Sequence, residues 1–232
     1  MTGHHHHSPS DDTHSPAGSS HADPTAFWEA RYGERPRIWS GNPNRALVES
    51  VVGLTPGTAL DLGCGEGADS LWLAEQGWRV TGIDLAAVAL ERAAAEAETR
   101  GIASDRITWQ RADLAEWQPG SDERYDLVSA CFLHAPVEVV FPRDEVLRRA
   151  AGTVTPGGHL LVVGHAGVPP WAGKHDHSGT PLPTNAEVLA ALALDPDVWT
   201  TVIDENRTRP VTMPDGSPAE IDDAILLLRR TA

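Results

Sequence analysis

The chain has 232 residues, with 33 Asp and Glu against 18 Lys and Arg, and a formal net charge of −15 at pH 7. This length suits one α/β domain and is ample for a hydrophobic core. The negative charge argues against nucleic acid as a partner, because phosphate binding depends on clustered Lys and Arg. Charged residues at 22% and apolar residues at 41% are ordinary for a folded protein and exclude global disorder.

The cysteine count and the hydropathy pattern bear on where the protein works. Two cysteines, Cys64 and Cys131, cannot build a disulfide framework, which favours a reducing compartment. No apolar run approaches the roughly 18 residues that a membrane-spanning helix needs, and no signal peptide is recognised. We therefore expect a cytoplasmic protein without membrane contact, either a monomer or a homodimer.

Residues 1–24 differ in composition from the rest of the chain. They are rich in Ser, Pro and Gly, lack apolar periodicity and hold six of the eleven histidines. Because the segment buries too little apolar surface to offset its chain entropy, we expect a disordered His-rich tail. The run from His4 to His7 is either a purification scar or a native metal-sequestering tract. The folded part is then a single domain of residues 25–232.

From residue 25 onward, helical and strand-like segments alternate. Apolar residues at helical spacing predict helices, and short apolar runs that end in turns predict buried strands. In chain order we expect helices at 26–32 and 44–52, a strand at 58–62, a helix at 68–76, a strand at 79–83, a helix at 86–100, strands at 106–111 and 125–132, a helix at 143–153, a strand at 159–163 after a turn at 156–158, a helix from Thr184 to Leu194, and strands at 198–205 and 223–229.

This alternation predicts the fold class. Alternating β and α units of this length imply an α/β protein with helices on both faces of a mainly parallel sheet, a Rossmann-like three-layer αβα sandwich. The expected sheet has seven strands. Its last two strands have no helix between them, so they should form an antiparallel pair at one edge.

The strongest local motif is the turn after the first expected strand. The sequence DLGCGEG (61–67) places glycines where a strand passes into a helix, so the chain can turn tightly and a ligand can approach the backbone. Alone, this spacing also fits a dinucleotide fingerprint. A carboxylate at Asp61 would repel a pyrophosphate, however, and suits a ligand that carries a cationic amino group.

Two further carboxylates follow the next two strands. Asp84 ends the second expected strand, where a carboxylate can accept hydrogen bonds from both hydroxyls of a ribose. Asp113 and Leu114 end the third strand, at the height of an adenine ring in such a sheet. Asp113 could instead serve only as a helix N-cap. The three spaced carboxylates favour a bound nucleoside over a glycine turn without a ligand.

Together these segments resemble the class I S-adenosylmethionine-dependent methyltransferases. The resemblance rests on DLGCGEGADS (61–70), VTGID (80–84), RADL (111–114), YDLVSACFLH (125–134) and TPGGHLLVVGH (155–165), in that order. The preceding FWEARYGERPRIWSGNPN (27–44) further resembles the subgroup with thiopurine, thiol and tellurite-resistance methyltransferases, in which aromatic residues fold over the cofactor. The resemblance implies S-adenosylmethionine as cofactor and S-adenosylhomocysteine as product.

By this resemblance, the cofactor is held by the glycine turn, by the next strand ends and by a helical lid at 25–53. The methionine moiety is expected at Asp61, Gly63, Cys64 and Gly65, the ribose at Asp84 and Leu85, the adenine at Asp113 and Leu114, and the donor methyl near Cys131 and Phe132, with Trp28, Tyr32 and Trp39 closing the lid. We interpret Cys64 as a small turn residue and not as a nucleophile.

Histidines dominate the side of the site where a methyl acceptor would bind. In the resembled fold the fourth and fifth strands are neighbours, so His134 and His165, which follow them, should meet over the donor methyl. Only His159 should lie at the opposite end of its strand. An expected active-site loop at 164–183 adds Trp171, Lys174, His175, Asp176 and His177.

Three interpretations of these histidines stay open. As a general base, His134 or His165 would take a proton from the acceptor, because the pKa of histidine lies near neutrality. As metal ligands, His165, His175 and His177 would bind a divalent ion such as Zn²⁺, which would deprotonate and fix a thiol. In the third interpretation they are polar residues on a solvated loop.

These patterns favour an enzyme that methylates a small molecule by direct SN2 transfer. The resemblance to the thiol and thiopurine subgroup implies a thiol or another soft or heteroaromatic nucleophile as acceptor. The sequence CFLH (131–134) stands where nucleic-acid amino methyltransferases have an Asn-Pro-Pro-Tyr type motif, which agrees with the negative charge in disfavouring DNA and RNA. The alternatives are an O- or N-methyltransferase of a secondary metabolite, and a non-catalytic protein that binds the cofactor or a metal.

Overall fold

The computed structural model describes residues 22–136, 138–167, 182–213 and 215–231. Nearly all of the predicted disordered tail and most of the predicted active-site loop lie outside these residues. The described elements are α1 (Pro24–Gly33), α2 (Arg45–Val51), β1 (Thr58–Leu62), α3 (Ala68–Glu75), β2 (Arg79–Asp84), α4 (Ala87–Thr99), β3 (Ile107–Arg111), β4 (Tyr125–Cys131), α5 (Arg143–Ala151), β5 (Val154–His165), α6 (Asn185–Leu192), β6 (Trp199–Thr212) and β7 (Pro218–Arg230).

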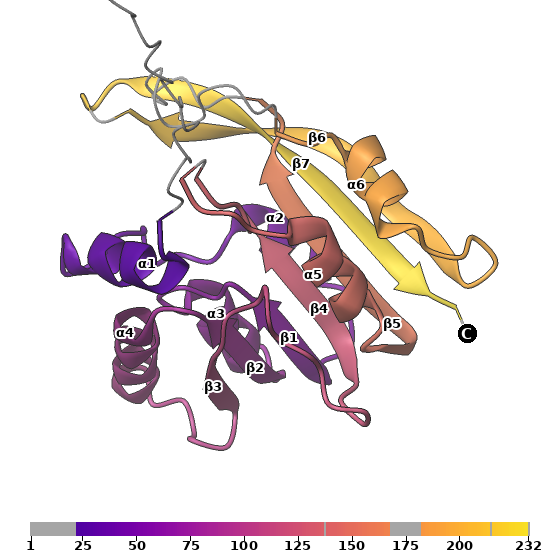
Figure 1. Cartoon of the computed structure of the whole chain (residues 1–232), viewed down its shortest axis with the longest axis horizontal. Coiled ribbons are helices and arrows are strands. Elements are labelled where there is room, and N and C mark those ends of the chain that lie inside the picture. The colour runs from indigo at the N-terminus through magenta and orange to yellow at the C-terminus, as the bar shows by residue number, and fades with distance from the viewer. Residues whose placement is uncertain (1–21, 137, 168–181, 214, 232) are drawn as a thin grey trace, which may run out of the picture.

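The described strands form one sheet in the order β3-β2-β1-β4-β5-β7-β6 (Figure 1). Strands β1 to β5 run parallel to one another, and β7 runs antiparallel to both β5 and β6. Six of the seven strands therefore share one direction. This arrangement confirms the predicted Rossmann-like sheet with an antiparallel pair at its edge.

Helices cover both faces of the sheet. Alternate residues of β5 belong to different apolar clusters: Leu160 packs with α5 and α6, and Leu161 packs with α2 and α3. A strand that is buried on both faces needs a continuous apolar run, which explains the sequence HLLVV at 159–163. Figure 1 shows α5 and α6 in front of the sheet and α1 beside α4. Across the described ranges, no helix is long and apolar enough to cross a bilayer.

Side chains that precede the first and last helices satisfy free backbone N–H groups. Asp23 accepts a hydrogen bond from the Ala26 amide at 2.7 Å, and Pro24 occupies the first turn of α1, where it costs no hydrogen bond. Thr184 and Glu187 form a reciprocal capping box at the start of α6. The cap predicted at Thr184 is confirmed, although α6 ends at Leu192, two residues before the predicted end.

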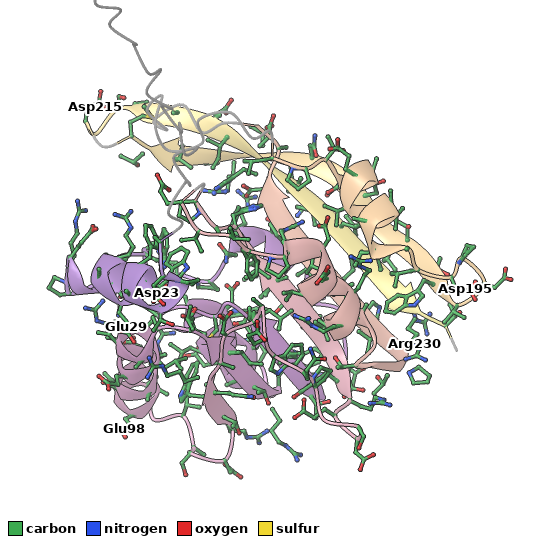
Figure 2. All side chains as sticks on the ribbon, viewed as in Figure 1. Asp23, Glu29, Glu98, Asp195, Asp215 and Arg230 are labelled. Carbon is green, nitrogen blue, oxygen red and sulfur yellow. The ribbon has the colours of Figure 1, made fainter. Side chains whose placement is uncertain are left out.

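The three C-terminal strands are longer than the sequence predicts. Strand β5 begins at Val154, so the predicted turn at 156–158 lies within the strand, where the register with β4 shifts between Tyr125 and Leu127. Strands β6 and β7 form a long hairpin that runs past the edge of the sheet (Figure 1). In Figure 2, Asp215 marks one end of this hairpin and Arg230 the other. The Arg230 guanidinium donates to the Val154 carbonyl at 2.8 Å and so joins the hairpin to the start of β5.

We expect Leu60→Ala to lower the free energy of unfolding by about 3 kcal/mol, because the Leu60 side chain in β1 is fully buried and its loss leaves a cavity. Urea unfolding measures this change. The matched control, Val202→Ala, removes an apolar side chain that is 52% exposed and should change the stability by less than about 0.5 kcal/mol. Equal losses of stability in both variants would contradict the burial of Leu60 in the hydrophobic core.

Candidate active site

The glycine turn between β1 and α3 is crowded by two other segments. Gly65 has a φ of 54°, and a Cβ atom placed there would lie 2.8 Å from the Tyr32 hydroxyl oxygen of α1. Gly63 has a φ of 67°, and its Cβ would lie 2.7 Å from a Leu133 methyl carbon, in the segment after β4. Glycine is therefore required here both for the backbone conformation and for close approach. The turn touches the predicted lid on one side and the predicted acceptor segment on the other.

Asp84, at the end of β2, holds this turn in place. One carboxylate oxygen accepts a hydrogen bond from the Gly65 amide at 2.8 Å, and the other accepts from the Ala86 amide at 2.9 Å, just before α4. The side chain is 8% exposed, and burial raises the pKa of its carboxyl group. The Leu85 backbone amide also bonds to this carboxyl group, which leaves acceptor capacity for one further donor such as a ribose hydroxyl.

Asp61, inside β1, is a second buried carboxylate. It accepts hydrogen bonds from the hydroxyls of Ser70 at 2.6 Å and Ser129 at 3.2 Å. Burial, together with the nearby Asp69, raises the pKa of Asp61 to about 7. A cationic ligand beside Asp61 would stabilise its ionised form and so lower its pKa.

Asp69, in the first turn of α3, is a buried carboxylate that the sequence reading did not single out. It accepts hydrogen bonds from the Asn44 backbone amide at 2.6 Å and from the Asn44 side-chain amide at 2.8 Å. A further side-chain hydrogen bond joins Asp69 to Cys131, at the end of β4. Asp69 therefore links α2, α3 and β4 beneath the site. The sequence feature that could have identified Asp69 is its position directly after the glycine turn.

The predicted lid residues lie next to the glycine turn. Tyr32 is 4% exposed, and the Trp39 indole N–H donates to its hydroxyl oxygen at 3.3 Å. The Trp28 and Tyr32 rings lie 6.1 Å apart, centroid to centroid. Burial, and to a lesser degree Asp84, raises the pKa of the Tyr32 hydroxyl, so Tyr32 is neutral and can donate a hydrogen bond.

Two glutamates that the sequence reading missed fasten the lid. The Glu66 carboxylate accepts hydrogen bonds from the backbone amides of Ile38 and Trp39, both at 3.1 Å, and pairs with the Arg92 guanidinium at 2.8 Å. Glu29 lies between α1 and α4 (Figure 2), where it accepts a hydrogen bond from the Ala87 amide at 2.8 Å. Neither residue has a local pattern that marks this role, because each contact joins distant parts of the chain.

The two residues expected beside an adenine ring have clear structural roles. Asp113 accepts a hydrogen bond from the Ala115 amide at 2.8 Å and stabilises a turn at 114–116; no helix begins there, so the interpretation as a helix N-cap is wrong. Leu114 is 6% exposed, and its side chain packs in the apolar cluster under α5. A contact of Leu114 with an adenine ring would therefore have to run through its backbone. Leu85, expected at the ribose, is half-buried, and its carbonyl accepts from Arg111 at 3.1 Å.

Neither cysteine is arranged as a nucleophile. A Cβ placed on Gly82 of β2 would lie 3.1 Å from the Cys64 sulfur, so the Cys64 side chain points toward the sheet. Burial raises the pKa of the Cys64 thiol well above its usual value, and burial together with nearby carboxylates does the same for Cys131. Both groups therefore stay protonated near neutral pH, in agreement with the interpretation of Cys64 as a turn residue.

The structure brings His134 and His165 together at the ends of β4 and β5. Their ring centroids lie 6.4 Å apart with an angle of 23° between the planes, and the Phe132 ring lies 4.5 Å from that of His165. Phe132 has a φ of 53°, a conformation that is costly for a bulky residue and that turns the chain sharply after β4. His159, expected at the opposite end of its strand, lies in the middle of β5 because the strand begins at Val154, and burial lowers its pKa.

The predicted metal site is not supported. His175 and His177, two of its three ligands, lie outside the described residues. Within the part of the chain that the structure describes, no three His, Cys, Asp or Glu side chains gather as a set of metal ligands. The other residues expected in the active-site loop, Trp171, Lys174 and Asp176, also lie outside that part.

Comparison with known proteins adds to this geometry. Residues 59–158 match a family described as a methyltransferase domain. The 2-heptyl-1-hydroxyquinolin-4(1H)-one methyltransferase of Mycobacteroides abscessus is 34% identical over 129 residues, which cover 54% of this chain and 54% of that protein. A ubiquinone biosynthesis O-methyltransferase of Serratia proteamaculans is 28% identical over 137 residues, 58% of this chain and 54% of that protein. The chain thus spans about half the length of these curated relatives.

A solved structure shares the fold over a longer stretch. The N-methyltransferase NodS from Bradyrhizobium japonicum, in complex with S-adenosyl-L-homocysteine, superposes with a TM-score of 0.63 at 19% identity and covers 90% of this chain and 100% of that chain. Sheet order, glycine turn and family match agree with one another. Residues 59–158 therefore carry a methyltransferase domain, and the chain has the fold of a methyltransferase that binds S-adenosyl-L-homocysteine.

Proposed function

We propose that this protein methylates an ionisable hydroxyl or thiol group of a small aromatic or heteroaromatic molecule, with S-adenosylmethionine as the methyl donor. The contact between Leu133 and Gly63 carries the proposal. It joins the turn expected to hold the donor to the segment that leads into His134, at the end of β4. This proximity supports a donor site beside the acceptor site, as a one-step displacement requires.

The residues around the glycine turn fit S-adenosylmethionine. Asp84 is a buried carboxylate that can accept a ribose hydroxyl, and Asp61 favours the cationic amino group of the methionine moiety. The absence of a side chain on Gly65 lets the Tyr32 hydroxyl approach the turn closely. When bound, the cofactor supplies an electrophilic methyl carbon. The chain's own part is to orient the acceptor, to exclude water with the aromatic lid, and to remove the acceptor's proton.

The acceptor class follows from what a histidine can deprotonate. An imidazole with a pKa near neutrality is matched to acidic hydroxyl or thiol protons. The names of the relatives, a hydroxyquinolone methyltransferase and a ubiquinone biosynthesis O-methyltransferase, favour a hydroxyl group. The resemblance of residues 27–44 to the thiol and thiopurine subgroup favours a thiol, and both belong in a test panel. The net charge of −15 supports a small-molecule acceptor over a nucleic acid.

We expect turnover when the protein is given S-adenosylmethionine and a panel of matched hydroxy- and mercapto-substituted heteroaromatic compounds, with S-adenosylhomocysteine release as the measurement. His165→Ala should lower kcat on the order of 100-fold, because a general base contributes about that much or more. The affinity of the His165→Ala variant for S-adenosylhomocysteine should equal that of the wild type. His159→Ala, six residues before His165 in β5, is the control.

Two results would contradict this prediction. Full turnover in both His134→Ala and His165→Ala would reject a histidine base. Binding of S-adenosylhomocysteine without turnover on any compound of the panel would favour a cofactor-binding protein without catalytic activity.

We expect Gly65→Ala to weaken the binding of S-adenosylhomocysteine at least about tenfold, because its Cβ would lie 2.8 Å from the Tyr32 oxygen and displace the lid. Titration calorimetry measures the affinity. Gly101→Ala is a matched control: Gly101 also has a positive φ, of 68°, but a Cβ there has no neighbour within 4 Å. It should cost about 1 kcal/mol of stability and leave the affinity unchanged. Equal losses of affinity would mean that the lid contact plays no part.

Cofactor binding should be linked to proton release from Asp61. The pKa of Asp61 is raised to about 7 in the free protein, and a cationic amino group beside it would lower that pKa. Affinity for S-adenosylhomocysteine should therefore rise as the pH is raised toward 7 and level off above it. Calorimetry at about pH 6 in buffers of different ionisation enthalpy counts the protons released. Asp61→Asn should abolish the buffer dependence, and a wild-type enthalpy that does not vary with the buffer would refute the linkage.

A further inference from the structure

Strand β7 places a buried carboxylate directly opposite His165. In the antiparallel ladder of β5 and β7, His165 pairs with Asp223, so both side chains lie on the same face of the sheet. Asp223 is 3% exposed, and its Oδ1 atom lies 3.6 Å from Nδ1 of His165. Among the described residues, neither atom has a hydrogen-bond partner.

The chemistry of the two groups decides where the proton of His165 lies. Buried polar atoms are costly unless they are hydrogen-bonded, and these two atoms, neither with another partner among the described residues, lie 3.6 Å apart. An ionised carboxylate can only accept, so Nδ1 must carry the hydrogen. In a neutral imidazole the lone pair then lies on Nε2, the nitrogen on the far side of the ring from Asp223.

Two further residues fix Asp223 and His165. The Arg209 Nε atom of β6 donates to the other Asp223 oxygen, Oδ2, at 2.5 Å, and so compensates the buried charge. The same guanidinium lies 5.8 Å from the centre of the Phe132 ring, which in turn packs on His165. Arg209, Asp223, Phe132 and His165 therefore form one contiguous cluster. Its members come from the segment after β4, from β5 and from the hairpin of β6 and β7.

We propose that Asp223 is a positioning residue for methyl transfer: it holds the proton of His165 on Nδ1, so that Nε2 takes the proton of the acceptor. The inference rests on the proposed function, because it assigns His165 as the base. As the bond from the acceptor to the methyl carbon forms, the acceptor's proton moves to Nε2, and the electron pair of the broken sulfur–carbon bond stays on sulfur. The resulting imidazolium is stabilised by Asp223, and Arg209 keeps that carboxylate in place.

Nitrogen NMR of the ¹⁵N-histidine-labelled protein tests the tautomer directly. We expect His165, assigned by its absence in His165→Gln, to carry its proton on Nδ1 in the wild-type chain. In Asp223→Asn the amide can donate to Nδ1, so the proton should move to Nε2. The same variant should lose kcat on the order of 100-fold or more, with the KM for S-adenosylmethionine within about twofold of wild type.

The matched control is Asp222→Asn. Asp222 is exposed and accepts a hydrogen bond from the Thr208 hydroxyl at 2.6 Å, so its substitution should change neither tautomer nor kcat. A wild-type spectrum with the proton on Nε2 overturns the proposal, even where methyl transfer is observed and even if Asp223→Asn does not fold. A proton on Nδ1 that moves in Asp223→Asn supports it, even where no acceptor is methylated, a result that would count against the proposed function alone.

Discussion

Carboxylates buried near the edge of the sheet where β1, β2 and β5 end are the constraint on which the rest of this structure depends. Asp61, Asp84 and Asp223 are each less than 9% exposed, and a buried carboxylate is stable only where donors surround it. The donors are serine hydroxyls for Asp61, backbone amides of the glycine turn and of α4 for Asp84, and Arg209 for Asp223. Satisfying these groups fixes the turn, the start of α4 and the position of the hairpin. The residues that give the site its charge therefore also set its geometry.

The sheet topology brings the two halves of the site together. Strands β1 and β4 are neighbours, so the glycine turn after β1 lies beside the segment after β4, where Leu133 meets Gly63. Strand β5 is the next neighbour, which places His165 near His134. The strained backbone of Phe132 allows both contacts, because a sharp turn there directs the chain back across the strand ends. Among the described non-glycine residues, only Phe132 and Ala193 have a positive φ, and Phe132 is the one that lies beside His165.

Sequence patterns predicted this fold where the signals are local. Strand β1 and the starts of α3 and β2 lie where predicted, because an apolar run that ends in glycine has few alternative structures. The hairpin was predicted too short, since β6 is an exposed edge strand whose polar residues read as a loop until they pair with β7. Asp223 and Arg209 were missed for the same reason: their role depends on the register between strands, and no local pattern records it.

Comparison with relatives is informative about some segments of this chain and not about others. The family match spans residues 59–158 and so contains Asp61, Asp84 and the glycine turn, but it ends before His165 and excludes both α1 and the hairpin. Similarity in that segment bears on the cofactor. The lid aromatics, Asp223 and Arg209 lie outside that segment. The proposal for the acceptor therefore rests on residues that the family match does not cover, and substitutions of this chain's own side chains are what test it.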